Sequence, residues 1–455
     1  MTETSDPAKS GRLRDRENGV AEESKGWDTK YEWKAIALLT AGFGLVGLDR
    51  WVITDLAGAK ASTMVADLHL SNPPADIGNM VAVLGIAWGV AALFMGNLSD
   101  RIGRRKVLVP ALVIFSVMSA FSGMTGALMA MLGMRALMGL AEGAYCPTSF
   151  ATVAEASKPS RRGFNLGLQQ SAFSLIGLGF GPIIATQLLQ YFSWRWVFAI
   201  VGIPGILVAI LVAMTIREPL TITAKSDPNA PAIVKPKFRI GDLFKHRNVA
   251  LSMLTLLCAM CGIFVLSAFS PQYLTGYLKL SDQNMGFVVS AIGFGGFVGQ
   301  WGLSGLSDFI GRRLSAVLGF LGGAIFLVLF IRTGADSLPL LFAELFVSAA
   351  FSFGLLSLIT GPISTEAAPL GMIAGTGGVI IAVGEIFGGG VAPKIAGEIA
   401  GHWGIQYTLY MALGGLLLGI LVSLFYKETA PRLTKGDGSE LDKLENEVGG
   451  AVAGH

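Results

Sequence analysis

Long apolar segments alternate with short polar segments along almost the whole chain. A helix needs about 20 mostly apolar residues to cross a membrane, because each residue spans ~1.5 Å of a hydrocarbon core ~30 Å thick. Twelve segments satisfy this requirement. They are residues 33–58, 76–98, 107–125, 127–153, 164–190, 195–216, 248–277, 284–304, 314–332, 338–361, 373–398 and 405–426. The pattern predicts an all-α membrane protein with twelve transmembrane helices.

Polar stretches divide these spans into two sets of six. A linker at residues 217–247 separates a predicted bundle at 32–216 from a second one at 248–426. Residues 1–31 and 427–455 are polar and predict disordered tails. The first tail mixes acids with bases and has no apolar core, so we do not expect a signal peptide.

The polar segment after the second span recurs after the eighth. The matching residues share one offset of about 208 positions; they are Asp100 and Asp308, Gly103 and Gly311, Arg104 and Arg312, and Arg105 and Arg313. A repeat of nearly half the chain predicts two bundles of similar structure. Two such bundles that rock about a central site are the physical basis of alternating-access transport.

The composition agrees with a membrane location. The residues are 52% hydrophobic and 14% charged, whereas a soluble domain carries about 25% charged residues. The 60 glycines suit helices whose backbones approach closely. We therefore expect the lipid bilayer to surround the protein.

The distribution of lysine and arginine predicts the orientation. With both termini inside, 27 of the 34 lie in cytoplasmic segments. Four lie outside, at Lys60, Arg195, Lys279 and Arg332, and three lie within spans, at Arg50, Arg135 and Lys394. This asymmetry follows the positive-inside rule. We expect a multi-pass protein of a cell's inner (plasma) membrane with cytoplasmic termini.

The repeated segment resembles the loop motif of the major facilitator superfamily. From Gly96 it reads Gly-x-x-x-Asp-Arg-x-Gly-Arg-Arg-Lys, and the resemblance extends from about Tyr31 to Glu428. It implies the major facilitator fold, with two pseudo-symmetric six-helix bundles around a central cavity.

The charged residues of both copies are candidates for a gate on the cytoplasmic side. They are Asp100, Arg101, Arg104, Asp308 and Arg312. Such charges can pair with helix ends or with one another when that side closes, or they can simply anchor the bundle. The resemblance implies a clamp that holds the cytoplasmic face shut. The second copy has Phe309 where the first has Arg101, so we expect a weaker clamp there.

The first predicted span contains Asp49 and Arg50, and the fourth contains Arg135 and Glu142. Ionisable groups within a membrane are costly and indicate a functional site, although a static ion network is the alternative. Arg135 and Glu142 are seven residues apart and share a helix face. Counting residues along the spans places Asp49 level with Arg135, which predicts that these two pair. Arg50 is then left for an anion and Glu142 for a proton.

The same residues resemble the anion:cation symporter branch of the superfamily. Asp-Arg occurs in the first span, and Arg-x6-Glu-Gly with a later proline occurs in the fourth. The branch takes up organic acids with protons and includes sialic acid and vesicular glutamate transporters. The resemblance implies that Asp49 and Glu142 carry protons, and that Arg50 and Arg135 hold the substrate carboxylate or couple it to them.

Three polar residues are further candidates for substrate binding. Gln169 and Gln170 lie in the fifth span and either reach a substrate hydroxyl or bond a neighbouring helix. Tyr273, in a Pro-x-Tyr-Leu run that resembles the seventh span of the branch, either lines the cavity or belongs to an interfacial aromatic belt.

Glu385 lies near the middle of the eleventh span. It is a candidate proton site or substrate contact. The alternatives are a partner for Lys394, nine residues away, or for a charge in the other bundle.

Enzyme chemistry is not indicated. Cys146, Cys258 and Cys261 fall in predicted spans and are expected to pack, and none of the four histidines is clearly mid-span. We find no metal-ligand cluster and no nucleophile with a base, and we expect no cofactor and no nucleic-acid partner.

The function that these features favour is proton-coupled import of a small organic anion, a carboxylate such as a sugar acid or an aromatic acid, by a monomer. The alternative is a proton-driven drug or metabolite exporter, because Gly177-x3-Gly181-Pro182 partly resembles the antiporter motif. Two arginines in the cavity argue for anions and against that alternative.

Overall fold

The computed structural model describes residues 28–158, 161–218, 245–368, 373–430 and 433. Most of the predicted tails at 1–31 and 427–455 and most of the predicted linker at 217–247 lie outside these residues, although Thr29 to Tyr31 belong to a helix. The boundaries of the two bundles at that linker therefore stay predictions.

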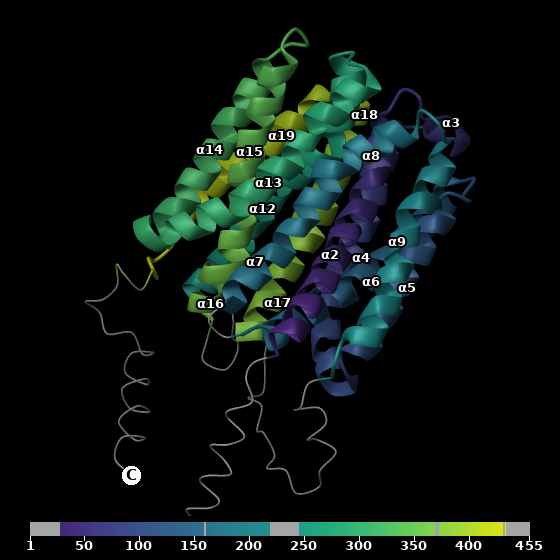
Figure 1. Cartoon of the computed structure of the whole chain (residues 1–455). Coiled ribbons are helices and arrows are strands. Elements are labelled where there is room, and N and C mark those ends of the chain that lie inside the picture. Colours follow the sequence, from purple (N-terminus) through teal and green to yellow (C-terminus); the bar gives the residue numbers. More distant parts are fainter. Residues whose placement is uncertain (1–27, 159–160, 219–244, 369–372, 431–432, 434–455) are drawn as a thin grey trace, which may run out of the picture.

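The first half of the chain forms six long helices, counted over the described residues (Figure 1). They are α2 (Thr29–Gly58), α4 (Pro73–Ile102), α5 (Arg105–Ser122), α6 (Leu128–Ala156), the continuous run α7 (Arg162–Ala172), η2 (Phe173–Phe180) and α8 (Gly181–Leu188), and α9 (Trp194–Thr215). A single turn, α3 (Met64–Asp67), lies between α2 and α4.

The second half repeats this arrangement in the described part of the chain. Its helices are α12 (Arg247–Gln272) with η3 (Tyr273–Tyr277), α13 (Asp282–Ile310), α14 (Arg312–Arg332), α15 (Leu338–Leu358) with η4 (Ile359–Ile363) and α16 (Ser364–Ala367), α17 (Ile373–Val383) with η5 (Gly384–Val391) and α18 (Ala392–Trp403), and α19 (Gln406–Ser423).

Eleven helices in the described ranges are long and apolar enough to cross a membrane. The twelfth predicted span is also present as α6, which has 29 residues and packs against α4 and α5. Arg135 and Glu142 lower the mean hydropathy of α6, so it does not qualify by composition. All twelve predicted spans are therefore helical, and the helix that composition alone misses is one that carries candidate site residues.

Helix ends coincide with residues that favour them. The Asp28 side chain caps α2 by accepting a hydrogen bond from the Tyr31 N–H at 3.0 Å. Gly103 and Gly311 end α4 and α13 with positive φ angles of 115° and 98°, which glycine adopts without a Cβ penalty. Both helices run further than expected, so Asp100 lies in the last turn of α4.

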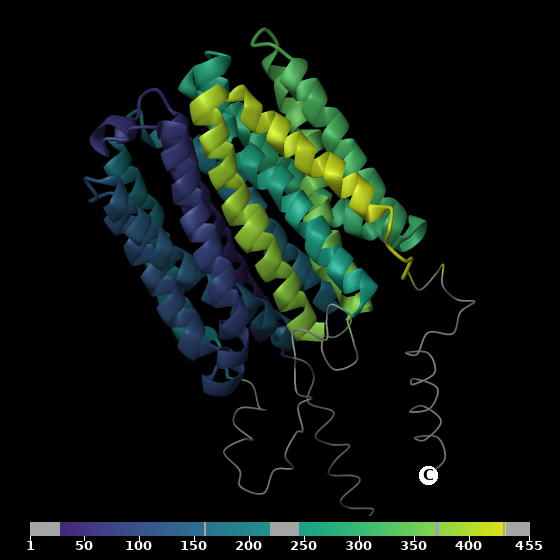
Figure 2. The same cartoon turned by 180° about the vertical axis from the view of Figure 1, so that it is seen from behind.

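The helices form two bundles that meet along a long interface (Figures 1 and 2). Across this interface α4 packs against the α17–η5–α18 run, α13 packs against η2 and α8, and α2 packs against α12. We call the end where α2 begins and α19 ends the terminal end, and the end where α2 stops and α13 begins the distal end. Arg247, at the start of α12, donates a hydrogen bond to the Phe425 carbonyl at the terminal end.

Glycines let the two bundles approach closely toward the distal end. Gly85 of α4 faces Gly389 and Gly390 of η5, and Gly293 of α13 lies against the backbone of Gly179 in η2. Helices in lipid associate through such close packing, because lipid chains are as apolar as the side chains. The distal part of the interface is thus a tight contact between backbones.

Two π-helical segments face this interface at corresponding positions. η2 spans Phe173–Phe180 in the fifth membrane run and η5 spans Gly384–Val391 in the eleventh. Segments of this kind are frequent at functional sites, because the extra residue per turn re-aims side chains. Glu385 is the second residue of η5.

Substitution of Gly293 by alanine should destabilise the contact between the bundles. Its Cβ would overlap the backbone of Gly179, which cannot rotate away, and overpacking typically costs about 1–3 kcal/mol. The midpoint of thermal unfolding in detergent should therefore fall. Gly302→Ala, in the same helix, is the control, because a Cβ there meets nothing within 4 Å. A Gly293→Ala protein as stable as Gly302→Ala would contradict the close approach.

Candidate functional site

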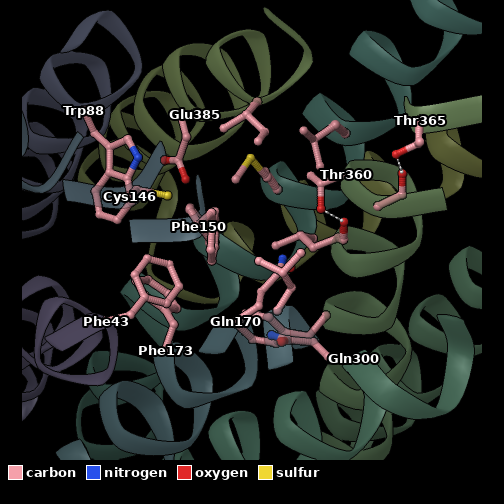
Figure 3. A pocket seen from close by; sticks show the side chains of 18 residues that line it. Phe43, Trp88, Cys146, Phe150, Gln170, Phe173, Gln300, Thr360, Thr365 and Glu385 are labelled. Carbon is pink, nitrogen blue, oxygen red and sulfur yellow. Dashed lines mark hydrogen bonds between the residues drawn. The ribbon is translucent and has the colours of Figure 1, made fainter. Parts of the chain in front are cut away.

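A cavity of about 320 Å³ lies between the two bundles (Figure 3). Side chains of both halves line it, including Phe43 and Gln170 from the first half and Phe264 and Thr360 from the second. Ligand pockets in proteins commonly measure about 300–1,000 Å³. The cavity is therefore large enough for one small molecule and lies where alternating access would place a substrate.

Most of the cavity wall is apolar. Six of the lining residues are aromatic: Phe43, Trp88, Phe150, Phe173, Phe264 and Phe353. The polar lining residues in the described part of the chain are Gln170, Gln300, Thr360, Thr365 and Glu385. Figure 3 shows Trp88, Cys146 and Glu385 together on one side of the cavity, with Thr360 and Thr365 on another.

An ion pair joins the two bundles at this wall. The Arg50 Nη2 atom of α2 lies 2.8 Å from the Glu385 Oε2 atom of η5, and both side chains are almost fully buried. The Arg50 guanidinium also lies over the rings of Trp88 and Phe264, at 4.8 and 4.6 Å from their centroids. Glu385 therefore pairs with a charge in the other bundle, which is one of the alternatives given above. The other alternative partner, Lys394, is exposed.

Arg50 still has unused donors. Its Nε and Nη1 atoms are buried and have no hydrogen-bond partner among the described residues. The expectation that Arg50 is left free for an anion was thus wrong for its Nη2 group, which Glu385 occupies. A carboxylate that took the place of Glu385 could bind the guanidinium through two N–H groups.

Asp49 and Arg135 lie at the same depth, as expected, but their side chains do not form the expected ion pair within the described part of the structure. Arg135 Nη1 donates to the main-chain carbonyl oxygens of Asp49 and Arg50, at 3.1 and 3.4 Å. Asp49 Oδ1 instead accepts a hydrogen bond from the Ser119 hydroxyl of α5 at 2.7 Å. Arg135 thus holds the backbone of the segment that carries the other charges.

Glu142 is fully buried in α6. Neither carboxyl oxygen has a hydrogen-bond partner in the ranges that the structure describes. The charges of Asp49, Arg50, Arg135 and Glu385 all act on it electrostatically. A carboxylate is costly to bury without a hydrogen bond, whereas the neutral acid is much less so.

The other predicted binding residues separate into two groups. Gln170 lines the cavity, whereas Gln169 is fully buried outside it and its amide atoms are unpartnered among the described residues. Tyr273 does not line this cavity in the described structure. Its ring stacks on Tyr277 with centroids 5.2 Å apart and contacts Phe330.

A charged cluster organises the terminal end of the first bundle. Arg104 pairs with Asp100 at 2.8 Å and with Glu155 of α6 at 2.7 Å, and it donates to the Ser99 hydroxyl at 2.6 Å. The Glu218 carboxylate accepts hydrogen bonds from the backbone N–H groups of Arg104 and Arg105, which follow Gly103. These contacts lie within one bundle, and Arg101 is exposed.

The second bundle contains the same cluster. Arg312 pairs with Asp308 at 2.7 Å and with Glu366 at 2.9 Å, and it also donates to the Ser307 hydroxyl. Glu428 accepts the backbone N–H groups of Arg312 and Arg313. The second cluster therefore makes every counterpart contact of the first, although Phe309 replaces Arg101.

Sequence reasoning missed four acids of these clusters: Glu155, Glu218, Glu366 and Glu428. The repeat itself could have identified them, because each pair recurs at an offset within a few residues of that of the motif. It also missed Asp55, a buried acid of α2 whose Oδ2 atom has no hydrogen-bond partner among the described residues. An acid inside a predicted span was the available signal.

Hydrogen bonds between the bundles close the distal end. The Asp282 carboxylate at the start of α13 accepts the backbone N–H groups of Lys60 and Ala61, both at 2.8 Å. The Lys60 ammonium donates to the Leu280 carbonyl at 2.8 Å, and the Thr275 hydroxyl donates to the Gly58 carbonyl at 2.6 Å. Nothing in the sequence pattern pointed to these loop contacts.

Within the described residues, no group of three or more His, Cys, Asp or Glu side chains could hold a metal ion.

Comparison with known proteins gives one family. The model of the Major Facilitator Superfamily matches residues 39–386 and 253–448 of the chain. A D-galactonate transporter of Escherichia coli is 24% identical over 391 residues, which cover 80% of this chain and 90% of that protein. A cis,cis-muconate transport protein of Acinetobacter baylyi is 23% identical over 415 residues, covering 89% and 95%.

A solved structure has the same fold. The crystal structure of a bacterial homologue of the human lysosomal transporter Spinster, inward-facing and unoccupied, matches with a TM-score of 0.68. The two chains are 18% identical, and the match covers 88% of this chain and 97% of the other.

Acid should remove the contribution of Glu428 to stability. Partial burial opposes ionisation of this carboxyl, but the backbone N–H groups of Ala430, Arg312, Arg313 and Thr429 outweigh it and lower its pKa below the ordinary 4.5. A lowered pKa stabilises the fold above the unfolded value, and this contribution is lost as the pH falls through the folded value.

Glu428→Gln should therefore unfold at a lower temperature than the unsubstituted protein near neutral pH. The difference should shrink as the pH falls below about 4.5. Thermal unfolding of both proteins across this range is the measurement, with Glu398→Gln at an exposed position as the control. A difference that stays constant with pH would contradict the role of the carboxylate.

Proposed function

This chain belongs to the major facilitator superfamily, and we propose that it imports a small organic anion together with protons by alternating access. It is a multi-pass membrane transporter and not an enzyme. The observation that carries the proposal is the buried ion pair between Arg50 and Glu385, which joins the bundles at the wall of the cavity.

The anion exchanges places with Glu385 in the proposed cycle. Its carboxylate binds the Arg50 guanidinium, which has unpartnered N–H groups among the described residues. Glu385 is then released from the other bundle. Breaking a buried ion pair without a replacement costs about 3–5 kcal/mol, so the empty protein does not part the bundles readily here. A bound anion supplies the replacement.

Protons complete the charge balance. When the anion takes Arg50, the displaced Glu385 carboxylate would stay in an apolar wall without its partner, which a bound proton avoids. Glu142 and Asp49 are buried within the same electrostatic network and act as the further proton carriers. Anion binding and proton binding therefore favour each other, which is the thermodynamic requirement for symport.

The two ends of the molecule suit a gated cycle. Contacts between the bundles hold the distal end closed, whereas each terminal charged cluster is held within its own bundle. We assign Asp100, Arg101, Arg104, Asp308 and Arg312 to gating at the terminal end, which faces the cytoplasm by the positive-inside rule. Gln170 is assigned to the substrate, and the protein acts as a monomer in a cell's inner membrane.

The relatives support an anionic substrate. The two named above are transporters of D-galactonate and of cis,cis-muconate, both of which are carboxylates. An arginine beside the cavity suits such substrates, because the guanidinium can bind a carboxylate through two N–H groups.

Replacement of Glu142 by glutamine should abolish proton-driven accumulation and leave exchange of substrate across the membrane. The amide keeps the shape of the side chain but cannot take up and release the proton. Uptake of radiolabelled organic acids into proteoliposomes, with and without an imposed pH gradient, measures both activities.

Glu344→Gln is the matched control for this experiment. Glu344 is also a buried acid within a span, in α15, but it does not line the cavity in the described structure. Its substitution should leave accumulation unchanged. Accumulation by Glu142→Gln against a gradient would refute the proton role, and accumulation driven by the opposite pH gradient would indicate an exporter.

Replacement of Glu385 by glutamine should strengthen anion binding and lower the thermal stability of the ligand-free protein. The internal competitor for Arg50 is then neutral, so the dissociation constant should fall about tenfold, which corresponds to about 1.4 kcal/mol. Equilibrium binding to the purified protein and thermal unfolding without ligand are the measurements. Weaker binding by Glu385→Gln than by the unsubstituted protein would contradict the exchange.

A further inference from the structure

The cavity has one positive charge at its wall. The residues that line it in the described structure include no lysine, arginine or histidine. Arg50 lies directly behind Glu385, Trp88 and Phe264. A second carboxylate on the same substrate would have no counter-charge within this apolar wall, and burying it would be costly. The site therefore suits a substrate with a single carboxylate.

The walls next to this charge are aromatic on both sides. In the first half, Phe43 contacts Phe150 and Phe173 with ring centroids 5.1 and 5.4 Å apart, and Phe173 meets Trp88 at 6.2 Å. Phe264 belongs to the second half of the lining. Aromatic rings pack edge-to-face or offset against one another, so these walls favour a flat, apolar guest.

Few polar groups remain for substrate hydroxyls. The Thr360 and Thr365 hydroxyls donate to carbonyl oxygens of their own helices, at 2.7 and 2.8 Å, and offer only lone pairs to a ligand. The Gln300 amide donates to the Ser174 hydroxyl, and its Oε1 atom has no partner among the described residues. Besides Glu385, the polar side chains that line the cavity in the described structure are Gln170, Gln300, Thr360 and Thr365, so a polyhydroxylated acid with a hydroxyl on almost every carbon would leave part of its hydrogen-bonding capacity unsatisfied.

We propose that the substrate is a monocarboxylate with a flat and mainly apolar body, of the class of aromatic acids. The proposal rests on the proposed function, because it takes the cavity beside Arg50 as the anion site. The carboxylate replaces Glu385 at Arg50, and the ring lies between the Phe173 and Phe264 walls. Gln170 and Gln300 accommodate one polar substituent. The cavity volume of about 320 Å³ is sufficient for a single ring with its carboxylate.

Binding of three carboxylates to the purified full-length protein tests this class. The probes are benzoate, gluconate as a polyhydroxylated monocarboxylate, and phthalate as an aromatic dicarboxylate, each titrated by calorimetry. Benzoate should bind at least about tenfold more tightly than either of the others. Gluconate or phthalate binding as tightly as benzoate overturns the proposal, and so does the absence of benzoate binding.

Substitution of an aromatic residue in the cavity wall provides a second test. Phe173→Leu keeps an apolar side chain but removes the aromatic face, so benzoate binding should weaken about five- to tenfold. The control is Phe94→Leu, at a position 65% exposed on the surface of α4, which should bind benzoate unchanged. If Phe173→Leu does not fold, Phe353→Leu replaces it. Unchanged benzoate binding by the cavity variant contradicts the proposal.

Uptake into proteoliposomes separates this proposal from the proposed function. Proton-driven accumulation of gluconate without that of benzoate overturns the aromatic class and leaves proton symport intact. Benzoate binding without proton-driven accumulation supports the aromatic class and contradicts proton symport.

Discussion

A buried ion pair between two bundles constrains everything that this molecule can do. Arg50 and Glu385 meet at 2.8 Å with almost no exposure to solvent, and each belongs to a different bundle. Neither charge can be left alone in such surroundings without a large free-energy cost. In the proposed cycle, the bundles therefore separate at this point when the substrate anion, or a proton, takes over one side of the pair. That condition couples movement to binding in terms of elementary electrostatics.

The packing around the pair makes the condition effective. Toward the distal end, backbones approach at glycines such as Gly85 and Gly293, and hydrogen bonds of Asp282 and Lys60 cross between the bundles. Water is thus kept from the pair on that side, and electrostatic interactions are stronger where water is excluded. At the terminal end, Arg104 and Arg312 are each satisfied within their own bundle. Each bundle can therefore move as a unit without leaving these charges unpaired.

The helices and the depth of their charged residues could be predicted from the sequence, because helices that cross a membrane place each residue at a depth set by its position along the chain. Apolar runs gave all twelve helices in the described chain, and counting residues along them placed Asp49 and Arg135 at one depth. Counting residues along the helices does not give the rotation of a helix about its axis or the contacts between the bundles. Arg135 consequently bonds a backbone carbonyl and not the Asp49 carboxylate. The partner of Arg50 lies 335 positions away.

The same limit explains the amides and the tyrosine. Gln169 and Gln170 differ by one position, about 100° of rotation on a helix, and only Gln170 reaches the cavity. Tyr273 lies at the start of η3 and stacks on Tyr277. The acids Glu155 and Glu366, in contrast, follow from the repeat, because their roles depend on position along the chain and recur in both halves.

The repeat also shows where the two halves differ. The difference indicates which contact between the bundles resists their separation more strongly. Ser174 and Glu385 are the second residues of η2 and η5, and each makes a hydrogen bond across the bundle interface, to Gln300 at 3.3 Å and to Arg50 at 2.8 Å. A neutral hydrogen bond contributes about 0.5–1.5 kcal/mol, whereas breaking a buried ion pair costs several times more. The hydrogen bond of Ser174 therefore resists separation less than the ion pair of Glu385 does. In the proposed cycle, separation of the bundles is therefore governed by the ion pair between Arg50 and Glu385 at the wall of the cavity.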